Sequence, residues 1–545
     1  MSEITIPKDY LEGLKENWKT DILSGFTIFL IAMPLCIGIA IASGAPPLAG
    51  ILSGIVGGII ASLISGSYVT INGPAAGLIV AVLSSIESLG EGDRILGFQY
   101  TLAVIFVSGI LQMIMGYFRL GKFAILFPTT VIHGMLAGIG LIIIAKQIHI
   151  ALGVVPIGKS VIDLILEIPS SLINMNPYVS FIGITSIVLM LLYPKLKWKF
   201  TKKIPAPLIL VILSISIEMY FNFAQEHTYT FWGKEYSVSS LYLVSLPSDL
   251  FSGLMHPDFS KTLTGQFGIE VFAITMIGSL ESLLTANAVD KLDPYKRTTD
   301  MNRDLMAKGF SNSILGLIGG IPIIAEVVRS SANIDNGAKT RWSNFFHGLF
   351  LLLAVIFIKD IIEKVPLSAL SGMLVVVGLR LAIPEFLKTI KTGFDQFLIF
   401  IVTVYFTISH DLLVGVGIGI LVKGLIHFIN VILPDGITIN DFARPAYKKS
   451  EKEEDGKKEV IFQFHGILIF LNYFFLKMEL DSISEDSKII LDFNKLRLVD
   501  LTVMENLHDF ERIHKNKGGE FEIRGLENSR TLAGGMLSGR KIEHS

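Results

Sequence analysis

The chain has 545 residues, of which 51% are hydrophobic and only 17% are charged, and its mean hydropathy is +0.60. Soluble domains carry about 25% charged residues, so this composition excludes a cytosolic enzyme, a nucleic-acid-binding protein and a disordered scaffold. The net charge of −2 predicts neither a polyanionic nor a polycationic partner. With one cysteine, Cys36, no internal disulfide forms, and no cofactor or metal centre is expected from a cysteine and histidine cluster.

Residues 1–20 are polar and are expected to form a cytoplasmic N-terminus. Apolar windows of about 20 residues, enough to span a bilayer as a helix, then recur between residues 21 and 433 and predict a transmembrane transport domain. Full-length candidates lie at 22–42, 47–65, 98–118, 123–145, 178–193, 205–222, 266–289, 304–320, 343–358, 366–383, 394–410 and 412–432. Two shorter apolar stretches, 73–86 and 321–333, bring the number of predicted segments to 14.

Lysine and arginine are concentrated in alternate predicted loops, such as those at 195–203 and 291–303. Cytoplasmic loops of membrane proteins carry this excess of positive charge. The bias therefore predicts a multi-pass protein of the cell inner (plasma) membrane, with both termini in the cytoplasm.

The composition changes after residue 433. The stretch 434–458 is rich in charge and is interpreted as a linker. Alternating apolar runs at 460–464, 489–493 and 521–525, with a helical pattern at 502–515, predict a small cytoplasmic α/β domain over 459–530. Residues 531–545 are expected to be a tail.

The two short apolar stretches indicate an internal repeat, with halves at about 21–222 and 266–433. Pro74 and Pro322 occupy matching positions, and proline is tolerated in the first turn of a helix. Both stretches are therefore expected to be half-helices that begin inside the membrane. The charge bias makes them run in opposite directions, so that their N-termini face each other and form an anion site. Broken helices at matching positions are typical of transporter binding sites.

Ionisable side chains inside apolar segments are candidates for function, because burying them in lipid is costly. Glu281 lies in the middle of a predicted span, and Thr285 follows on the same helical face, so the pair can hold a proton or Na⁺. Glu326 and Arg329 are three residues apart in the second half-helix. Glu326 is expected to pair with Arg329, to be protonated during transport, or to help bind a coupling cation. Cys36 is interpreted as a packing residue.

Several dispersed motifs resemble the SulP (SLC26) anion transporters over about residues 15–530. The motifs are Met33-Pro34, Ala42-Ser-Gly-Ala-Pro-Pro47, Asn72-Gly-Pro-Ala-Ala-Gly77, Glu281-Ser-Leu-Leu-Thr285, Gly319-Gly-Ile-Pro322 and Arg329-Ser-Ser-Ala-Asn333. The resemblance implies two inverted seven-segment repeats, a core domain that moves against a gate domain, a C-terminal STAS domain and a homodimer.

The stretches Asp290-Lys-Leu-Asp-Pro-Tyr-Lys-Arg297 and Val328-Arg-Ser-Ser-Ala-Asn333 resemble a bacterial branch whose members are often linked to carbonic anhydrase. That resemblance implies bicarbonate as the first choice of substrate, sulfate as the second, and carbonic anhydrase as a functional partner.

The resemblance also implies site residues. The anion would contact Leu35, Ile39, Ala75, Ala76, Gly77, Ala325, Glu326 and Val327, with Arg329 nearby, and Glu281 and Thr285 would bind the coupling ion, a proton or Na⁺. The sequence departs from the family pattern at Glu326, where a small or neutral residue is usual, and at Ala325, where glycine is common. In the STAS-like domain, Asp500-Leu-Thr-Val-Met504 replaces the usual Asp-Ser-Ser-Gly, which leaves Thr502 as a poor substitute for a phosphorylated serine.

The sequence thus favours secondary active transport of a small inorganic anion by alternating access, coupled to protons or Na⁺, and no enzymatic activity. Three alternatives share its motifs. An uncoupled exchanger or channel would show no cation dependence. A carrier of organic dicarboxylates or nucleobases would use Glu326 as a hydrogen-bonding group. A membrane sensor would bind an anion without moving it.

Overall fold

The computed structural model describes residues 6–121, 127–158, 160–196, 204–249, 251–390, 392–410, 412–435, 445–454, 457–516, 518–526, 529–531 and 540–542. The chain divides into two compact units, one formed by residues 1–121 with 139–381 and the other by residues 122–138 with 382–545. Within the described residues, 8 helices are long and apolar enough to cross a membrane.

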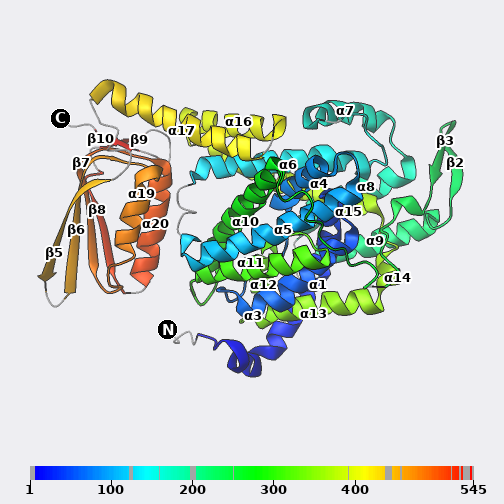
Figure 1. Ribbon diagram of the computed structural model, residues 1–545, viewed down its shortest axis with the longest axis horizontal. Coiled ribbons are helices and arrows are strands. Elements are labelled where there is room, and N and C mark those ends of the chain that lie inside the picture. Colours follow the sequence, from blue (N-terminus) through cyan, green and yellow to red (C-terminus); the bar gives the residue numbers. More distant parts are fainter. Residues whose placement is uncertain are drawn as a thin grey trace. The chain divides into compact units, whose positions relative to one another are not determined.

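All of the segments predicted from the sequence overlap described helices (Figure 1). The first repeat contains α1 (Tyr10–Ala42), α2 (Pro47–Val56), which continues to α3 (Ser62–Ile64), then α4 (Ile79–Gly90), α5 (Arg94–Tyr117), α6 (Thr129–Ala151), α8 (Pro177–Leu192) and α9 (Ala206–Phe221). The second contains α10 (Gly265–Leu292), α11 (Met301–Ile318), α12 (Val327–Asp335), α13 (Trp342–Phe357), α15 (Leu367–Ile390), α16 (Phe394–Ser409) and α17 (Leu412–Asp435). The fold is therefore two inverted repeats of seven segments.

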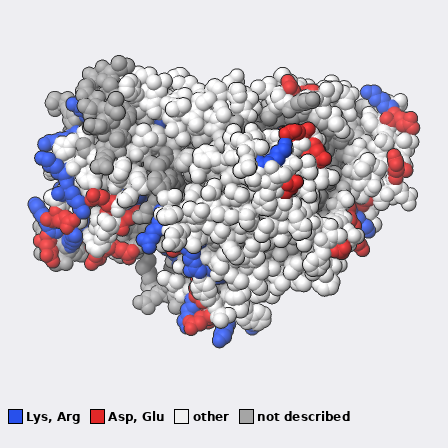
Figure 2. Space-filling model, in the orientation of Figure 1, with Lys and Arg blue, Asp and Glu red and all other residues white. Residues whose placement is uncertain are grey.

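Smaller elements join these helices. The helices α7 (Val161–Ile173) and α14 (Lys359–Ile362) and the hairpin β2 (His227–Phe231) with β3 (Lys234–Val238) lie in connections between segments. The face of the helical unit seen in Figure 2 has a large area without charged side chains. A lipid-facing surface requires such an area, because charge in the bilayer is costly.

The helix α11 is more polar than its neighbours, and it is buried against α5. Glycines make the contact close: a Cβ added to Gly309 would lie 2.5 Å from the carbonyl oxygen of Gly109. The same helix carries Asp304, Lys308 and Asn312 in the interior. Its polarity is tolerated because these side chains find partners inside the protein, described below.

The two half-helices begin later than the sequence indicated. Pro74 is the last residue of a short strand, β1 (Asn72–Pro74), and a 3₁₀ turn precedes α4. Pro322 directly precedes a second strand, β4 (Ile323–Ala325), and α12 begins at Val327. The expectation that each proline opens its helix is wrong, because the extended backbone that suits proline is used here for strand pairing before the helix starts.

The C-terminal part of the second unit contains a 6-stranded sheet in the order β5-β6-β7-β10-β9, with β8 also paired to β7. Its strands are β5 (Ala446–Glu454), β6 (Lys457–Leu468), β7 (Lys488–Val499), β8 (Glu520–Arg524), β9 (Ser529–Thr531) and β10 (Arg540–Ile542). The helices α19 (Phe470–Leu480) and α20 (Leu501–Asn516) lie along one face of it (Figure 1). The strands and helix predicted from alternating and helical patterns correspond to β6, β7, β8 and α20.

The charged stretch interpreted as a linker forms part of this sheet. Residues 446–454 are β5, which pairs antiparallel with β6 at the edge. Lys449 lies 3.1 Å from Glu451 and 3.5 Å from Glu479, so the charges are paired on the surface. Dense charge protects an edge strand from pairing with another chain, which is why the run resembles a linker. The strands β9 and β10 likewise extend the sheet beyond residue 530.

A buried ion pair lies within the second unit. The Lys423 ammonium of α17 lies 3.4 Å from Oδ2 of Asp500, and Nε2 of His427 is also 3.4 Å from that oxygen. Burial alone would raise the pKa of Asp500, but the positive charge of Lys423 and the His427 ring outweigh it and hold that pKa below its ordinary value. Asp500 also caps α20, because the Val503 N–H donates to Oδ1 at 2.8 Å.

Thr502 is part of the same cluster. Its side chain is 2% exposed, and Lys423 Nζ donates to its hydroxyl at 2.7 Å. A hydroxyl that is enclosed and already bonded is a poor target for a kinase, which agrees with the departure from the usual Asp-Ser-Ser-Gly motif.

Replacing Asp500 by asparagine should destabilise the full chain. Asparagine keeps an oxygen to cap α20, but the charge of Lys423 is left buried without a counter-charge, which costs about 3–5 kcal/mol. Thermal unfolding in detergent, followed by size exclusion after heating, measures the loss. The exposed Asp486→Asn is the control and should unfold like the wild type.

The difference between Asp500→Asn and the wild type should depend on pH. Because folding lowers the pKa of Asp500, its contribution to stability is complete above about pH 4, the ordinary aspartate pKa, and is lost as the pH falls below that value. The two unfolding temperatures should therefore differ by a constant amount from pH 7 down to about pH 4 and converge below about pH 4. A difference that stays constant below about pH 4 as well would contradict an ionised Asp500.

Candidate functional site

The two half-helices start from a common two-stranded crossing. The strands β1 and β4 are antiparallel, with Asn72 opposite Ala325, Gly73 opposite Ile324 and Pro74 opposite Ile323. Every residue in both strands is buried. Since the strands run in opposite directions, α4 and α12 leave this crossing in opposite directions, with their N-terminal turns beside it.

The start of α12 also holds the chain that leads into β1. The Glu326 N–H donates to the carbonyl of Ile71 at 2.9 Å, and the Ile71 N–H donates to the Ser330 hydroxyl at 2.9 Å. Asn333 donates to the carbonyl of Val69 at 2.8 Å. The motif Arg329-Ser-Ser-Ala-Asn333 therefore positions the half-helix of the other repeat.

A side chain of α11, Asn312, holds β4 in place through its backbone. The Asn312 amide accepts a hydrogen bond from the Ile323 N–H at 2.7 Å and donates to Gln112 of α5 at 2.9 Å. Ser282 of α10 accepts a longer bond, 3.4 Å, from the Ala325 N–H. Backbone groups that are freed where a membrane helix breaks are thus satisfied by protein atoms.

Arg329 braces the crossing with its guanidinium group. The side chain is 1% exposed, and its Nη2 donates to the carbonyl oxygen of Pro74 at 2.7 Å. Its Nη1 lies 3.6 Å from the sulfur of Cys36 on α1 and 2.5 Å from the point where a Cβ on Gly73 would be. Its positive charge is consequently held directly at the junction of β1 and α4. Cys36, interpreted as simple packing from the sequence, contacts this charged group.

Glu281 of α10 faces the first turn before α4. A Cβ added to Gly77 would overlap the Glu281 carboxylate, so only glycine leaves room for it. One carboxylate oxygen, Oε2, is buried and has no hydrogen-bond partner among the described residues. Thr285 is buried one turn later on the same helix. The predicted coupling pair is therefore placed beside the predicted anion contact Gly77.

Glu326 stands between β4 and α12 and does not pair with Arg329. Its side chain makes no capping bond to α12, and its buried Oε1 has no hydrogen-bond partner in the described part of the chain. The guanidinium of Arg329 is directed to Pro74 instead. Ser282, which follows Glu281 on α10, accepts from the N–H of Ala325, which precedes Glu326, so the two glutamates lie in one region. Of the three roles expected for Glu326, a static pair with Arg329 is excluded.

The other predicted contact residues surround the same crossing with different accessibility. Ile39, Ala75 and Ala325 are buried, whereas Leu35 and Ala76 are half-buried and Val327 is exposed. Val328, in the first turn of α12, is 62% exposed. The N-terminal turn of α12 thus combines a buried inner side with an accessible outer side.

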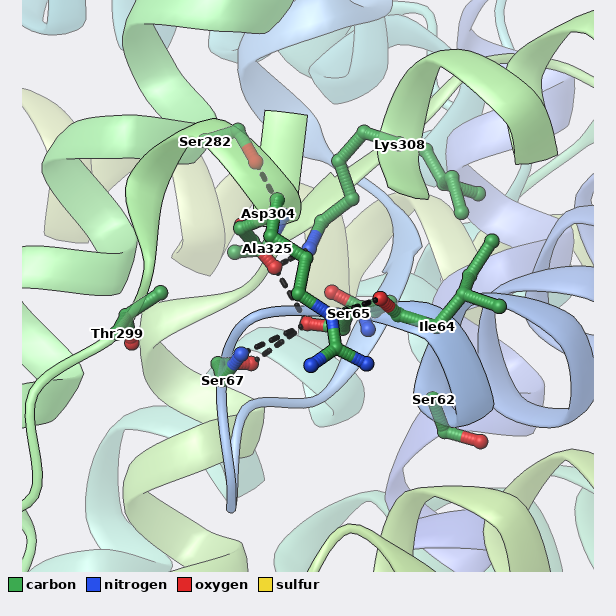
Figure 3. A network of polar contacts seen from close by, with 12 residues as sticks. Ser62, Ile64, Ser65, Ser67, Ser282, Thr299, Asp304, Lys308 and Ala325 are labelled. Carbon is green, nitrogen blue, oxygen red and sulfur yellow. Dashed lines mark hydrogen bonds and ion pairs between the residues drawn. The ribbon is translucent and has the colours of Figure 1, made fainter. Parts of the chain in front are cut away.

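A buried charged network supports the approach to β1 (Figure 3). Lys308 and Asp304, both on α11 and without exposed side-chain surface, are 2.6 Å apart. The Ser65 hydroxyl donates to the same Asp304 oxygen at 2.5 Å and accepts from the Ser67 N–H at 3.0 Å. This network holds the chain before β1 in place, because breaking a buried pair leaves an uncompensated charge.

Sequence reasoning did not assign roles to several supporting residues. Ser282 and Ser330 directly follow Glu281 and Arg329 in the two family motifs. Their place in these motifs was the only indication of a role that the sequence offered. Asn312 and Cys36 carried no signal, since the sequence does not show which groups a polar side chain or a thiol contacts across the fold. Asn72, in the motif Asn72-Gly-Pro, is 1% exposed, and neither polar atom of its amide has a partner in the described structure.

The inverted repeats, the two broken helices and the buried charges beside them define a multi-span membrane transporter, and not an enzyme. The sequence matches the Sulfate permease family over residues 18–403, and the chain belongs to that family. It is thereby a member of the SulP (SLC26) anion transporters.

Curated relatives have different substrates in their names. The chain is 27% identical to a bicarbonate transporter, BicA, of Picosynechococcus sp. over 415 residues, 75% of this chain and 70% of that protein. It is 26% identical to a putative sulfate transporter, YvdB, of Bacillus subtilis over 517 residues, 94% of this chain and 92% of that protein.

Solved structures share the fold. The transmembrane domain of a cyanobacterial bicarbonate transporter, BicA, superposes with a TM-score of 0.61 at 22% identity, covering 75% of this chain and 97% of that one. The structure of SLC26A9 superposes with a TM-score of 0.66 at 16% identity, covering 94% of this chain and 84% of that one. The second match extends the likeness into the C-terminal sheet domain, which fits a STAS domain.

Replacing Gly77 by alanine should impair transport while the protein still folds. The new methyl group would displace the Glu281 carboxylate and widen the gap between α10 and the start of α4. We expect anion uptake to fall by about tenfold or more, since a misplacement of about 1 Å at a site of this kind is costly. Initial rates in proteoliposomes measure the effect. Gly268→Ala, on the helix α10 that carries Glu281, has open space around the added atom, so it is the control and should transport normally.

Proposed function

We propose that the protein is a secondary active transporter that moves bicarbonate, or else sulfate, across the cell inner membrane, coupled to protons or Na⁺ by alternating access. The observation that carries the proposal is the crossing of β1 and β4, from which α4 and α12 diverge beside Arg329 and Glu281. Helix N-termini present unpaired N–H groups and partial positive charge, which favour an anion.

Bicarbonate is the first choice because two lines of similarity favour it. The sequence resembles a bacterial branch linked to carbonic anhydrase, and a relative and a solved structure of similar fold are named as bicarbonate transporters. Sulfate is the second choice, since the other curated relative is a putative sulfate transporter. Carbonic anhydrase would act as a functional partner by interconverting bicarbonate and CO₂ on one side of the membrane.

Coupling is assigned to Glu281 with Thr285. A carboxylate at membrane depth is expensive to keep charged and unpaired, and Oε2 of Glu281 has no hydrogen-bond donor among the described residues. A proton or Na⁺ at this position would remove the cost. Because Glu281 touches the turn that begins α4, loading the ion would also alter the charge that the anion meets.

In the proposed transport cycle, the anion site opens alternately to the two sides of the membrane. The crossing is tied to α1, α10 and α11 by buried polar contacts, so it can move as a rigid body with its ligands in place. The termini would lie in the cytoplasm, and two chains would form a homodimer in which the STAS-like domain serves as a platform.

Uptake into proteoliposomes tests the function. Labelled bicarbonate and labelled sulfate are supplied in parallel, each with an imposed Na⁺ gradient, an imposed proton gradient or neither, and empty liposomes correct for leakage of CO₂. We expect accumulation of bicarbonate that requires one of the two gradients. Accumulation of sulfate alone would show that the transported anion is sulfate and not bicarbonate. Flux without gradient dependence would show an uncoupled exchanger, and no flux of either anion would contradict anion transport.

Replacing Glu281 by glutamine should separate coupling from anion movement. The amide has nearly the same shape but can neither take up a proton nor carry the charge that Na⁺ requires. Gradient-driven accumulation should therefore disappear while exchange of anion for anion remains measurable. The exposed Glu87→Gln on α4 is the control. Full gradient-driven accumulation by Glu281→Gln would show that the coupling ion binds elsewhere.

A further inference from the structure

Glu326 introduces a negative group where an anion site would need a positive one. Its Oε1 is buried and has no donor within the described part of the chain, where the side chain neither caps α12 nor pairs with Arg329. Its backbone is fixed on both sides, because its N–H donates to Ile71 and its carbonyl accepts from the Ser330 N–H at 2.9 Å. The side chain is thus held at the start of α12 with one unused hydrogen-bond acceptor.

An unused buried acceptor is costly, and the cost disappears when a donor arrives. No described protein group supplies that donor to Oε1. A ligand bound at the start of α12 can supply it. Glu281 is a second carboxylate in the same region, because its neighbour Ser282 bonds to the Ala325 N–H. A ligand that brings only acceptor oxygens and two negative charges would therefore meet repulsion from both carboxylates.

Anions differ in what they offer to such an acceptor. At neutral pH bicarbonate carries one negative charge, two acceptor oxygens and one O–H donor. Sulfate carries two charges and four acceptor oxygens but no donor. Nitrate has the planar shape and single charge of bicarbonate but lacks the O–H group. Only the first of these can bond to backbone N–H groups and to Glu326 at the same time.

We propose that Glu326 is a specificity-determining residue, which accepts a hydrogen bond from the hydroxyl group of the transported anion and thereby selects oxyanions that carry an O–H, such as bicarbonate, over sulfate and nitrate. This inference rests on the proposed anion transport and names the chemical class of its substrate. A site built around a buried acceptor rejects ligands that lack the matching donor, because the acceptor is then left unpaired.

The test compares competition by unlabelled anions against uptake of labelled bicarbonate in proteoliposomes. In the wild type, nitrate and sulfate should compete at least about tenfold more weakly than bicarbonate, as expected for the loss of one hydrogen bond to a charged group. Nitrate separates the hydroxyl group from shape and charge, and sulfate adds the effect of the second charge.

Glu326→Gln keeps an acceptor oxygen but loses the charge that strengthens the bond, so it should weaken competition by bicarbonate by about tenfold while competition by nitrate is unchanged or improved. Glu326→Asp keeps the carboxylate and should keep the order of preference, which provides a second variant if the glutamine form is not recovered. Glu218→Gln is the matched control, because Glu218 on α9 is 2% exposed and also has a buried oxygen with no partner among the described residues.

The possible failures are distinguishable. If the wild type carries bicarbonate but nitrate competes equally well, or if Glu326→Gln changes bicarbonate and nitrate by the same factor, the role of Glu326 is wrong while anion transport stands. If the wild type prefers sulfate, Glu326 does not act as an acceptor for an anion hydroxyl. If no anion is carried at all, the proposed function fails and this inference fails with it.

Discussion

The transport core depends on the antiparallel pairing of β1 with β4. A helix that is broken inside a membrane exposes backbone N–H and C=O groups that lipid cannot satisfy. Here each broken segment satisfies the other, since the strands pair and the Glu326 N–H reaches the carbonyl of Ile71. The cost of each break is thereby offset by the other, and neither half-helix could be built alone.

The charged residues around the crossing follow from the same constraint. Arg329 donates to the carbonyl of Pro74, and Asn312 and Ser282 serve the backbone of β4. These groups are buried, so they fix the geometry instead of facing the ligand. Glu281 and Glu326 each keep a carboxylate oxygen that has no hydrogen-bond partner among the described residues. Two buried acceptors that lack a donor beside this hydrogen-bonded backbone mark the region where we expect ions to bind.

The second unit uses a buried charge in another way. Lys423 on a membrane helix and Asp500 at the start of α20 neutralise each other, and Thr502 completes the bonding of the ammonium group. The residue that replaces the usual phosphorylated serine is thereby enclosed. The ion pair joins the N-terminus of α20 to α17, and the altered motif supplies the residues that make this contact.

Much of the fold was determined by local sequence. Apolar length placed the membrane segments, and the matched prolines located both broken helices, because lipid permits few other arrangements. The same reasoning failed for β5, since alternating lysine and glutamate on an edge strand have the composition of a linker. It also placed the start of α4 and α12 too early, because strand pairing between residues about 250 apart leaves no local signal.

For the candidate site too, the sequence determined some features and the tertiary structure determined others. The sequence by itself determined that Glu281, Glu326 and Arg329 lie inside apolar segments, where charge requires a reason. Only the tertiary structure decided which charge serves which purpose. Arg329 turned out to bind Pro74 and not Glu326, and Gly77 proved to be the space that Glu281 occupies. Hydrogen bonds of side chains are made across the fold, between residues whose separation in the chain says nothing about their distance in space.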